Sequence, residues 1–311
     1  MSIKISNLGK CYGDFKALDN VSLEVHKNSI NSIVGHNGSG KTTLVKCLST
    51  LLLFDSGSIE FFGEKFDYRH YNKFRKRISL LLDASRNLYL NLTLLQNVKY
   101  FLQIKGTNFN EKKQLVDYYL EQFSLTEHKN KLVSSLSKGM QQKTALIIAL
   151  SQNSDLIILD EPNLGLDLDS ISVLKVILRQ ECKNRTVILT TQDVKLIEDV
   201  SKYLAVLDKG VLKYHGTIEQ FNTLSQNIIC SIYLNKEPTQ KVKGEFNKIG
   251  QSMEYKGNIV YGSFSKDSLD SILKLLQREN YVVLDIKTHE GFENNLKSIL
   301  DDRSLNNVSV G

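Results

Sequence analysis

The stretch Gly35 to Thr43 reads Gly-His-Asn-Gly-Ser-Gly-Lys-Thr-Thr and fits the phosphate-binding loop pattern G-x-x-x-x-G-K-[ST]. A run rich in β-branched apolar residues, Ile30 to Val34, precedes the loop, and apolar residues at helical spacing follow it. This order of strand, loop and helix is the context that the pattern requires. The sequence therefore predicts an α/β fold in which a buried strand delivers a loop to a bound phosphate.

The residue types in the loop suggest how it would bind phosphate. Its glycines let the backbone curl, so that successive N–H groups point at phosphates, which also meet the positive end of the following helix. Lys41 is expected to reach the β- and γ-phosphates of a nucleotide, and the Thr42 hydroxyl to lie on Mg²⁺. A glycine-rich turn without a ligand is the alternative, which the flanking strand and helix disfavour. The expected nucleotide contacts are Gly35, Asn37, Gly38, Ser39, Gly40, Lys41, Thr42 and Thr43.

Two carboxylates end a second buried strand. Four apolar residues, Leu156 to Leu159, lead directly into Asp160 and Glu161. Beside a phosphate loop, Asp160 is placed to hold the hydration shell of Mg²⁺. Glu161 can point at a water that attacks the γ-phosphate. The alternative, two surface charges at a strand end, is disfavoured by the presence of the phosphate loop.

Three further positions are ambiguous from the residues alone. Asp83 follows the apolar run Ile78 to Leu82 and either touches Mg²⁺ or its waters or begins a turn. Ser137 is a natural N-cap, which predicts either a second anion site or an ordinary capped helix. Tyr12 lies in a turn and either stacks on a nucleotide base or packs on that turn. For Ser137 and Tyr12, these segments alone favour the structural interpretation.

Composition excludes several classes of protein. With 41% hydrophobic and 24% charged residues, the chain is expected to be globular, and a net charge of +6 permits an anionic partner without demanding one. The four cysteines are widely spaced, which predicts reduced thiols and no metal centre. We expect no secretory signal, and no apolar run approaches the roughly 18 residues that span a bilayer. If the protein works at a membrane, another chain must supply the spanning part.

Periodicity divides the chain into two predicted domains. Residues 1–222 form the larger one, and within it the helical pattern of about 84–150 indicates an inserted α-helical subdomain. Residues 226–311 form the smaller one, where the order βαββαβ predicts a ferredoxin-like α+β domain. No site residues stand out in the smaller domain, so a regulatory or dimer-stabilising role is the expectation for it.

Taken together, the motifs resemble the ATP-binding subunits of ABC transporters over about residues 1–220. The resemblance implies a P-loop NTPase fold, with a RecA-like core, an antiparallel β-subdomain and the inserted helical subdomain. It also implies a role for each motif in family order. These are Tyr12 as the adenine-stacking aromatic, the loop Gly35 to Thr43, the signature Leu136 to Gln141, the strand Leu156 to Glu161 with its catalytic carboxylate, Gly165 to Asp167, and Gln192 at the switch position.

One branch of the family fits best. The signature variant Ser137 to Gln141 looks like the drug- and antibiotic-export branch, of the ABC-2-like type, and so do Arg86 to Tyr89 and Leu92-Thr93. Two positions depart from the family pattern, because a glutamine usually stands at Asp83 and a histidine at Gln192. A carboxylate at Asp83 adds negative charge beside the γ-phosphate, and Gln192 can donate a hydrogen bond but cannot carry a proton. We expect ATPase activity to survive both changes.

The resemblance also implies partners. Two copies of the chain would sandwich two molecules of ATP with Mg²⁺, each γ-phosphate held by Lys41 of one copy and by Ser137 and Gly139 of the other, with Gln141 nearby. Glu161, Gln192 and Lys41 would be the catalytic residues, and Thr42, Asp160 and Asp83 the metal contacts. A separately encoded permease, contacted by about residues 84–95, would hold the protein on the inner face of the cell membrane, in the cytoplasm. No nucleic acid partner is expected.

Two other classes of function stay open at this point. A soluble ATPase of the same superfamily, as in DNA repair or at the ribosome, would normally carry a long coiled-coil insertion or two tandem cassettes. Only about 70 residues separate Asp83 from Leu156, and a single phosphate loop is present. A nucleotide sensor with weak or no hydrolysis is kept open by the departures at Asp83 and Gln192.

Overall fold

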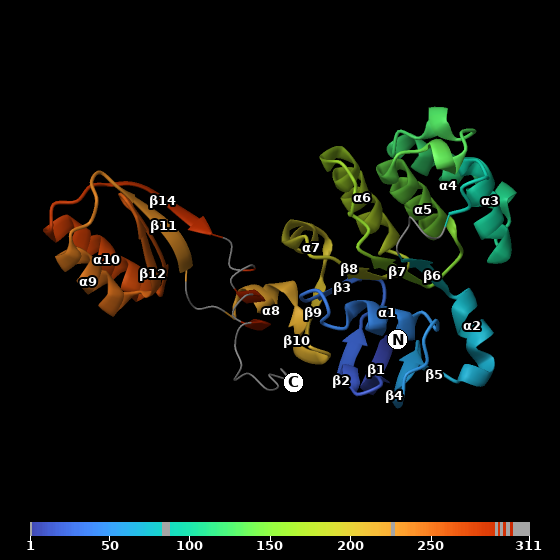
Figure 1. Cartoon of the computed structure of the whole chain (residues 1–311), viewed down its shortest axis with the longest axis horizontal. Helices are drawn as coiled ribbons and strands as arrows, with labels where there is room; N and C mark the ends of the chain where they lie inside the picture. Colours follow the sequence, from blue (N-terminus) through green and yellow to red (C-terminus); the bar gives the residue numbers. More distant parts are fainter. Residues whose placement is uncertain are drawn as a thin grey trace. The chain divides into compact units, whose positions relative to one another are not determined.

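The structure, a computed structural model, describes residues 2–82, 88–224 and 228–289, together with residues 292, 295, 296, 299 and 300. Asp83 and the segment Arg86-Asn87 therefore lie outside the described residues, as does the end of the chain from residue 301. The chain separates into two compact units, residues 1–218 and 219–302, which are treated separately below (Figure 1).

A six-stranded, mainly parallel sheet forms the centre of the first unit. Its strands, in sheet order, are β10 (Val211–Thr217), β9 (Tyr203–Asp208), β3 (Ile30–Val34), β8 (Thr186–Thr190), β7 (Leu156–Asp160) and β6 (Ile78–Leu81). Only β10, at one edge, runs antiparallel to its neighbour. β3 is buried throughout and β7 is buried from Leu156 to Leu159, because helices or a second sheet cover both faces. Their carboxyl ends lie on the same edge of the sheet, with only β8 between them.

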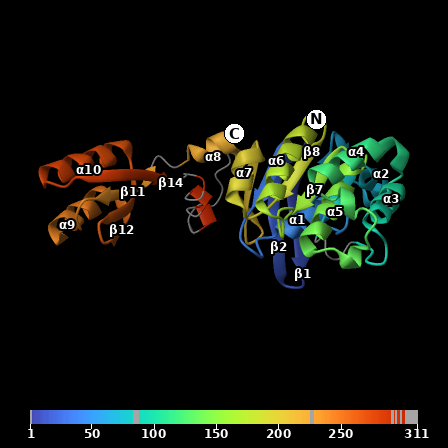
Figure 2. The ribbon, with the colours of Figure 1, turned by 90° about the horizontal axis from the view of Figure 1, so that it is seen from above.

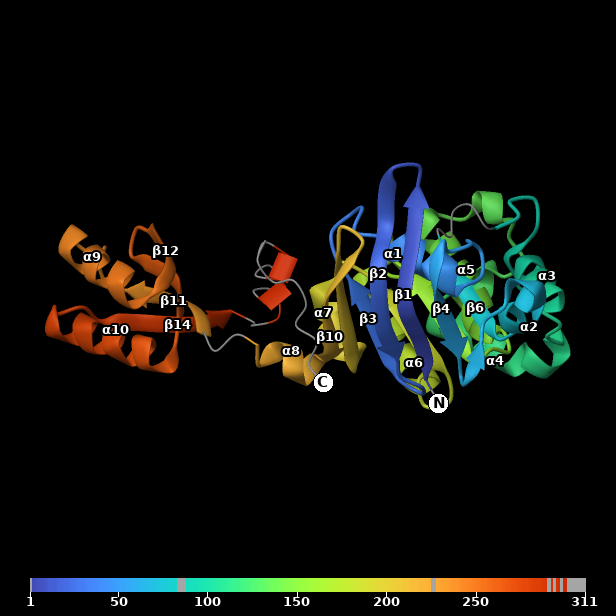
Figure 3. The ribbon, with the colours of Figure 1, turned by 90° about the horizontal axis from the view of Figure 1, so that it is seen from below.

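Helices cover one face of this sheet. They are α5 (Lys138–Ser151), α6 (Leu168–Glu181) and α7 (Val194–Val200), which Figures 1 and 2 show on the same side. On the other face lie α1 (Lys41–Leu48) and an antiparallel sheet, which Figure 3 shows from its open side. The strands of that second sheet are, in order, β2 (Phe15–Val25), β1 (Ile3–Tyr12), β4 (Ser56–Phe61) and β5 (Glu64–Lys65).

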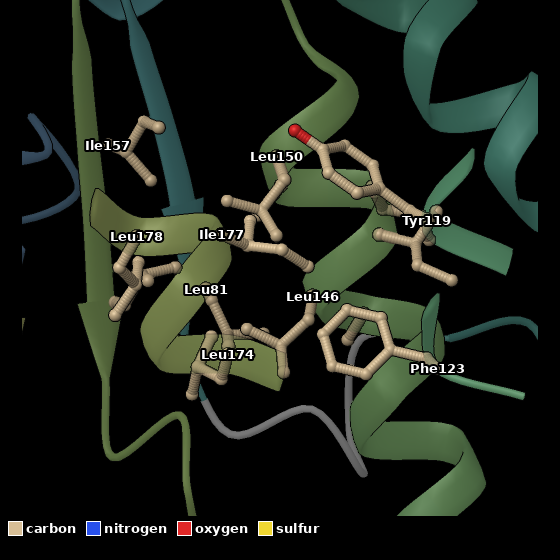
Figure 4. Packing of buried hydrophobic residues seen from close by; sticks show 14 of the residues in the cluster. Leu81, Tyr119, Phe123, Leu146, Leu150, Ile157, Leu174, Ile177 and Leu178 are labelled. Atoms are coloured by element: carbon tan, nitrogen blue, oxygen red, sulfur yellow. The ribbon is translucent and has the colours of Figure 1, made fainter. Parts of the chain in front are cut away.

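Further helices extend the β6 side of the unit. They are α2 (Tyr71–Lys76), α3 (Leu94–Ile104) and α4 (Phe109–Gln122), with short 3-10 helices at Tyr68–His70, Thr126–His128 and Val133–Ser135. A capping box at Thr93 and Gln96 starts α3. Figure 4 shows how α4 joins the core, because Tyr119 lies beside Leu150 and Phe123 beside Leu146, both in α5, within the cluster that also contains Leu174 of α6. The helical subdomain is thus fixed to the sheet by one continuous apolar cluster.

A mostly buried ion pair reinforces that junction. Arg185 pairs with Glu181 of α6 and donates hydrogen bonds to two carbonyl oxygens at the end of α5, those of Leu150 (2.8 Å) and Gln152 (3.0 Å). Glu181 also accepts a hydrogen bond from the Tyr119 hydroxyl of α4. One carboxylate and one guanidinium therefore connect α4, α5 and α6.

Replacing Arg185 by Met is expected to lower the free energy of unfolding by about 2 kcal/mol, because it leaves the Glu181 carboxylate without its counter-charge. Equilibrium urea unfolding followed by circular dichroism measures the change. The matched control is Lys73→Met, which breaks an ion pair with Glu64 whose side chains are both exposed, and there the change should stay below about 0.5 kcal/mol. Equal effects for the two variants would contradict the prediction.

The second unit is a four-stranded antiparallel sheet with two helices on one face. The sheet order is β12 (Gln251–Lys256), β13 (Ile259–Phe264), β11 (Ile228–Leu234) and β14 (Val283–His289), and the helices are α9 (Gln240–Ile249) and α10 (Lys266–Arg278). A further short helix, α8 (Ile218–Asn222), lies at the start of the unit. Val242, Phe246, Ile272 and Leu276 pack against Ile232 and its neighbours to form the core.

The fold class predicted from the sequence is confirmed. The first unit contains the predicted RecA-like core, antiparallel sheet and inserted helices, and the second has the βαββαβ order and the paired central strands of a ferredoxin-like domain. β1 continues to Tyr12, because its long hairpin with β2 keeps the backbone paired through a polar, exposed stretch.

Candidate functional site

The loop Gly35 to Gly40 lies between β3 and α1, and its glycines are required by space as well as by backbone angle. A side chain at Gly35 would bring its Cβ within 2.0 Å of the Leu207 carbonyl oxygen. At Gly40 the corresponding approach is 2.5 Å to the Ala17 carbonyl oxygen, and the backbone there is left-handed, with φ of 104°. The loop is therefore held against β2 and β9 in a shape that residues with side chains cannot adopt.

Lys41 is the first residue of α1, and its side chain turns back into the loop. Its Nζ donates to the carbonyl oxygens of Gly35 (2.7 Å) and His36 (3.0 Å). Burial lowers the pKa of this ammonium, while the nearby carboxylates of Glu161 and Asp160 act in the opposite direction. A cation held at a helix N-terminus within a glycine-rich loop is suited to bind a polyphosphate.

Asp160 ends β7 and faces the loop. Its Oδ2 accepts a hydrogen bond from the Thr42 hydroxyl at 3.1 Å, and its Oδ1 accepts one from Thr190. Thr190 is the residue of β8 that is paired with Asp160 on one side and with Ile33 of β3 on the other. The middle strand therefore fixes the carboxylate of β7 opposite the loop of β3.

The donor set fits Mg²⁺. The hydroxyl of Thr42 and the carboxylate of Asp160 are adjacent oxygen ligands, and Mg²⁺ in nucleotide sites uses one or two protein oxygens together with phosphates and waters. Within the described part of the chain there is no cluster of three histidine, cysteine or acidic side chains that would hold a metal by itself. The site is therefore suited to a metal that arrives with a polyphosphate.

Glu161 follows Asp160 in a left-handed conformation that side chains rarely adopt, with φ of 49°. Its N–H donates to the Thr190 carbonyl oxygen at 2.9 Å, which holds this turn in place. Burial raises the pKa of the carboxyl group, whereas the Lys41 ammonium lowers it. A partly desolvated carboxylate in a strained turn has the properties of a general base.

These residues share one cavity. Its volume is about 280 Å³, and it is lined by Tyr12, Phe15, Ala17, Asn37, Gly38, Gly40, Lys41, Thr42, Thr43, Asp160 and Glu161. Lys41 and the two carboxylates therefore lie on the same side of the molecule, as the sequence predicted. Tyr12 and Phe15, which also line the cavity, are both about half exposed.

Gln192 lies beside the loop. Its Nε2 donates to Asn37 Oδ1 at 2.7 Å, so the predicted switch residue contacts the phosphate loop directly. The preceding residue, Thr191, donates to Asn163 Oδ1 at 2.8 Å and so ties β8 to the segment after Glu161. The predicted metal contact at Asp83 lies outside the described residues.

The signature residues occupy a different place. Ser137 caps α5 by accepting from the Met140 N–H at 3.2 Å, as its residue type predicted. Gln141 donates to the carbonyl oxygens of Val133 and Leu136, each at 3.1 Å. Gly139 lies so close to the Gly165 carbonyl oxygen that a Cβ would approach it to 2.7 Å. None of Ser137, Gly139 and Gln141 lines the cavity that contains Lys41.

Sequence reasoning missed several supporting residues. Gln142 donates to the Pro162 carbonyl oxygen at 3.0 Å, and Lys143 pairs with Asp167 at 3.1 Å, so α5 is tied to the segment between β7 and α6. Thr190 had a usable signal, because it is a polar residue at the end of an otherwise apolar strand next to Gln192. Phe15 was missed because no local motif marks it, and only the hairpin between β1 and β2 brings it opposite Tyr12.

Comparisons with known proteins agree with this geometry. A family model described as ABC transporter matches residues 18–164. The chain is 33% identical over 218 residues to an uncharacterised ABC transporter ATP-binding protein, MJ1023, of Methanocaldococcus jannaschii, covering 70% of this chain and 78% of that one. It is 32% identical to the bacitracin transport ATP-binding protein BcrA of Bacillus licheniformis, with 68% of each chain covered.

Other similar proteins differ in what they are named for. The glutamine transport ATP-binding protein GlnQ of Geobacillus stearothermophilus is 27% identical and covers 75% of this chain and 98% of its own. Among solved structures, the ATP-binding cassette MJ0796, in a dimeric post-hydrolysis state with ADP and phosphate, superposes with a TM-score of 0.61 at 27% identity, covering 70% of this chain and 98% of that one.

Proposed function

Because this chain belongs to the family of ABC transporter ATP-binding proteins, we propose that it binds and hydrolyses ATP to power an exporter, and that the residues around its phosphate loop do this chemistry. The observation that supports the proposal is the single cavity that brings Lys41 together with Asp160 and Glu161. The loop supplies amides for the phosphates, and the strand supplies the two carboxylates that a hydrolase needs.

The proposed reaction uses few residues. Lys41 stabilises negative charge on the β- and γ-phosphates, and Glu161 accepts a proton as water attacks the γ-phosphorus. The new bond joins the water oxygen to phosphorus, and the bond to the β–γ bridging oxygen breaks, which leaves ADP and phosphate. Mg²⁺, when bound, neutralises the phosphate oxygens, and Thr42 and Asp160 are the residues that would hold it. Gln192, whose Nε2 donates to Asn37 of the loop, would donate a hydrogen bond to the γ-phosphate.

We propose that a second copy of the chain completes each site. Ser137 and Gly139 do not line their own chain's cavity, although they lie at the start of α5, where the N–H groups of a helix N-terminus favour an anion. The segment after Glu161 also carries two exposed leucines, Leu164 (72% exposed) and Leu168 (82% exposed). Exposed apolar side chains beside an incomplete polar site are typical of a surface that is covered on association.

We also propose a separate membrane permease as partner. No helix among the described residues is long and apolar enough to cross a membrane. A groove of about 490 Å³ lies between the sheet and the inserted helices, and its mainly apolar lining includes Leu51, Leu82, Tyr89 and Phe101. Such a groove suits an amphipathic helix of a partner. The protein would then lie on the inner face of the cell membrane, where ATP is available.

The most specific part of the proposal concerns the direction of transport and the class of compound that is transported. Similar proteins include one named for glutamine transport and one named for bacitracin transport, so family membership leaves the direction open. The signature variant Ser137 to Gln141 resembles the export branch, and we therefore propose export of a drug, antibiotic or antimicrobial peptide. Deleting the gene should increase the sensitivity of the cells to the exported compound if this proposal is correct.

The proposed permease contact can be tested with a pair of tyrosines. Tyr89 lines the groove, whereas Tyr71 is similarly exposed on α2 and does not line it. Tyr89→Glu should reduce co-purification with a polypeptide of about six spanning helices from a detergent extract about tenfold or more, because it places a charge in an apolar contact. Tyr71→Glu should leave it unchanged. Equal recovery with both variants would contradict docking in this groove.

A further inference from the structure

The hairpin between β1 and β2 carries the aromatic end of the cavity. Tyr12 and Phe15 are direct cross-strand partners, joined through Gly13, whose φ of 58° closes the turn. Both rings line the cavity that contains the phosphate loop. The position of these rings relative to Lys41 therefore depends on what anchors the hairpin, which extends as an exposed two-stranded ribbon at this end.

Asp55 provides the anchor. Its Oδ1 pairs with Lys10 Nζ at 2.8 Å, and its Oδ2 accepts a hydrogen bond from the Cys11 N–H at 2.7 Å. Its own N–H donates to the Gly9 carbonyl oxygen at 2.8 Å. One residue thus holds the three positions that immediately precede Tyr12.

Lys10 transmits this contact to the ring. Its ammonium lies 5.8 Å from the centre of the Tyr12 ring, within the range of a cation–π interaction, and its side chain is only 13% exposed. The hydrogen bond between Lys10 and Asp55 raises the pKa of Lys10 and lowers the pKa of Asp55, so both side chains are charged at neutral pH. The ring therefore has one side occupied by a fixed cation, and a flat ligand must stack against the other.

Asp55 is also connected to the phosphate loop by a short stretch of chain. It belongs to the segment that follows α1, and α1 begins at Lys41 beside the phosphate loop. The same stretch of chain that starts at the phosphate site thus returns to clamp the aromatic hairpin. The base and the triphosphate of a nucleotide are a fixed distance apart. A direct connection between the phosphate loop and the hairpin would therefore keep the two parts of the site at the matching distance.

We propose that Asp55 is a positioning residue for the nucleobase, which acts through Lys10 and the Cys11 amide to hold Tyr12 in place for stacking. The inference rests on the proposed function, because it requires that the cavity binds ATP. It adds a determinant of base affinity that lies outside the cavity and contacts none of the phosphates. A purely structural role is the rival explanation, in which the ion pair only stabilises the edge of the antiparallel sheet.

The test compares ATP with inorganic tripolyphosphate, which carries the charges but no base. Binding of each ligand in the presence of Mg²⁺ is measured by isothermal titration calorimetry. Asp55→Asn, which removes the charge but keeps an acceptor for the Cys11 amide, should weaken ATP binding about three- to tenfold and tripolyphosphate binding less than twofold. Lys10→Met should weaken ATP binding about two- to fivefold. In turnover assays the change should appear in KM, with kcat nearly constant.

Two controls separate this role from a structural one. Asp19→Asn breaks the Lys16–Asp19 pair (3.2 Å) on the same hairpin, which does not contact Tyr12, and should change neither affinity. In a Tyr12→Ala background, Asp55→Asn should have no further effect on ATP binding, since it acts through the ring. Equal weakening of both ligands by Asp55→Asn, or undiminished weakening without Tyr12, would overturn the inference. Wild-type protein that binds neither ligand would overturn the nucleotide site itself and this inference with it.

Discussion

The Lys41→Ala variant is expected to hydrolyse ATP at least about 100-fold more slowly than the wild type, because Lys41 is the only cation among the described residues that line the cavity. Its Nζ is held by the carbonyl oxygens of Gly35 and His36, at the place where the phosphates would lie. Phosphate release at saturating ATP and Mg²⁺, measured with a coupled assay, gives the rate. ATP affinity should fall as well, since the ammonium contacts the phosphates before and during the reaction.

Lys46→Ala is the matched control. It removes a lysine from the same helix, five residues further on, where the side chain is partly exposed and lies outside the cavity. This variant should turn over ATP at the wild-type rate. If wild type and Lys41→Ala are equally slow while both bind ATP, the chain is a nucleotide sensor, which is the alternative that the residues at positions 83 and 192 kept open. If wild type and Lys41→Ala both hydrolyse ATP rapidly and at the same rate, hydrolysis does not take place in the cavity that contains Lys41.

The phosphate loop and the carboxylate strand were predictable because each is a local pattern with its own chemistry. Few residues other than glycine can stand at positions 35 and 40 of the loop. The structure gives the reason, since the backbone carbonyls of Leu207 and Ala17 occupy the space that a side chain would need. The run Leu156 to Leu159 is apolar enough to require burial on both faces. Such constraints are visible in sequence because they act on consecutive residues.

The contacts that hold these parts together were not predictable in the same way. Thr190 joins β3 and β7 only because β8 lies between them in the sheet. The order of strands in a sheet cannot be predicted from the local spacing of apolar residues. Asp55 and Lys10 are separated by 45 residues and resemble ordinary surface charges until the hairpin brings them together. Pairings between distant residues depend on register, which a single sequence does not specify.

Replacing Glu161 by Gln is expected to leave ATP binding intact, to slow hydrolysis about 100-fold or more, and to trap two copies of the chain around ATP. The amide has the size of the carboxylate but accepts no proton from the attacking water, so the γ-phosphate that bridges the two chains is not removed. Ser137 and Gly139, which do not line their own cavity, are then held on the phosphate of the partner copy.

Sedimentation velocity at saturating ATP and Mg²⁺ measures this trapping, and the variant should sediment as a dimer with ATP and as a monomer with ADP. Glu121→Gln, an exposed position on α4, is the matched control and should behave as the wild type. Combining Glu161→Gln with Lys41→Ala should return the protein to a monomer, because the phosphate that bridges the two chains is then no longer held. A Glu161→Gln protein that stays monomeric under these conditions would contradict the sandwich arrangement. The assignment of the phosphate loop would then stand only on the slow turnover of Lys41→Ala, since each cavity would have to work without a signature helix from a second chain.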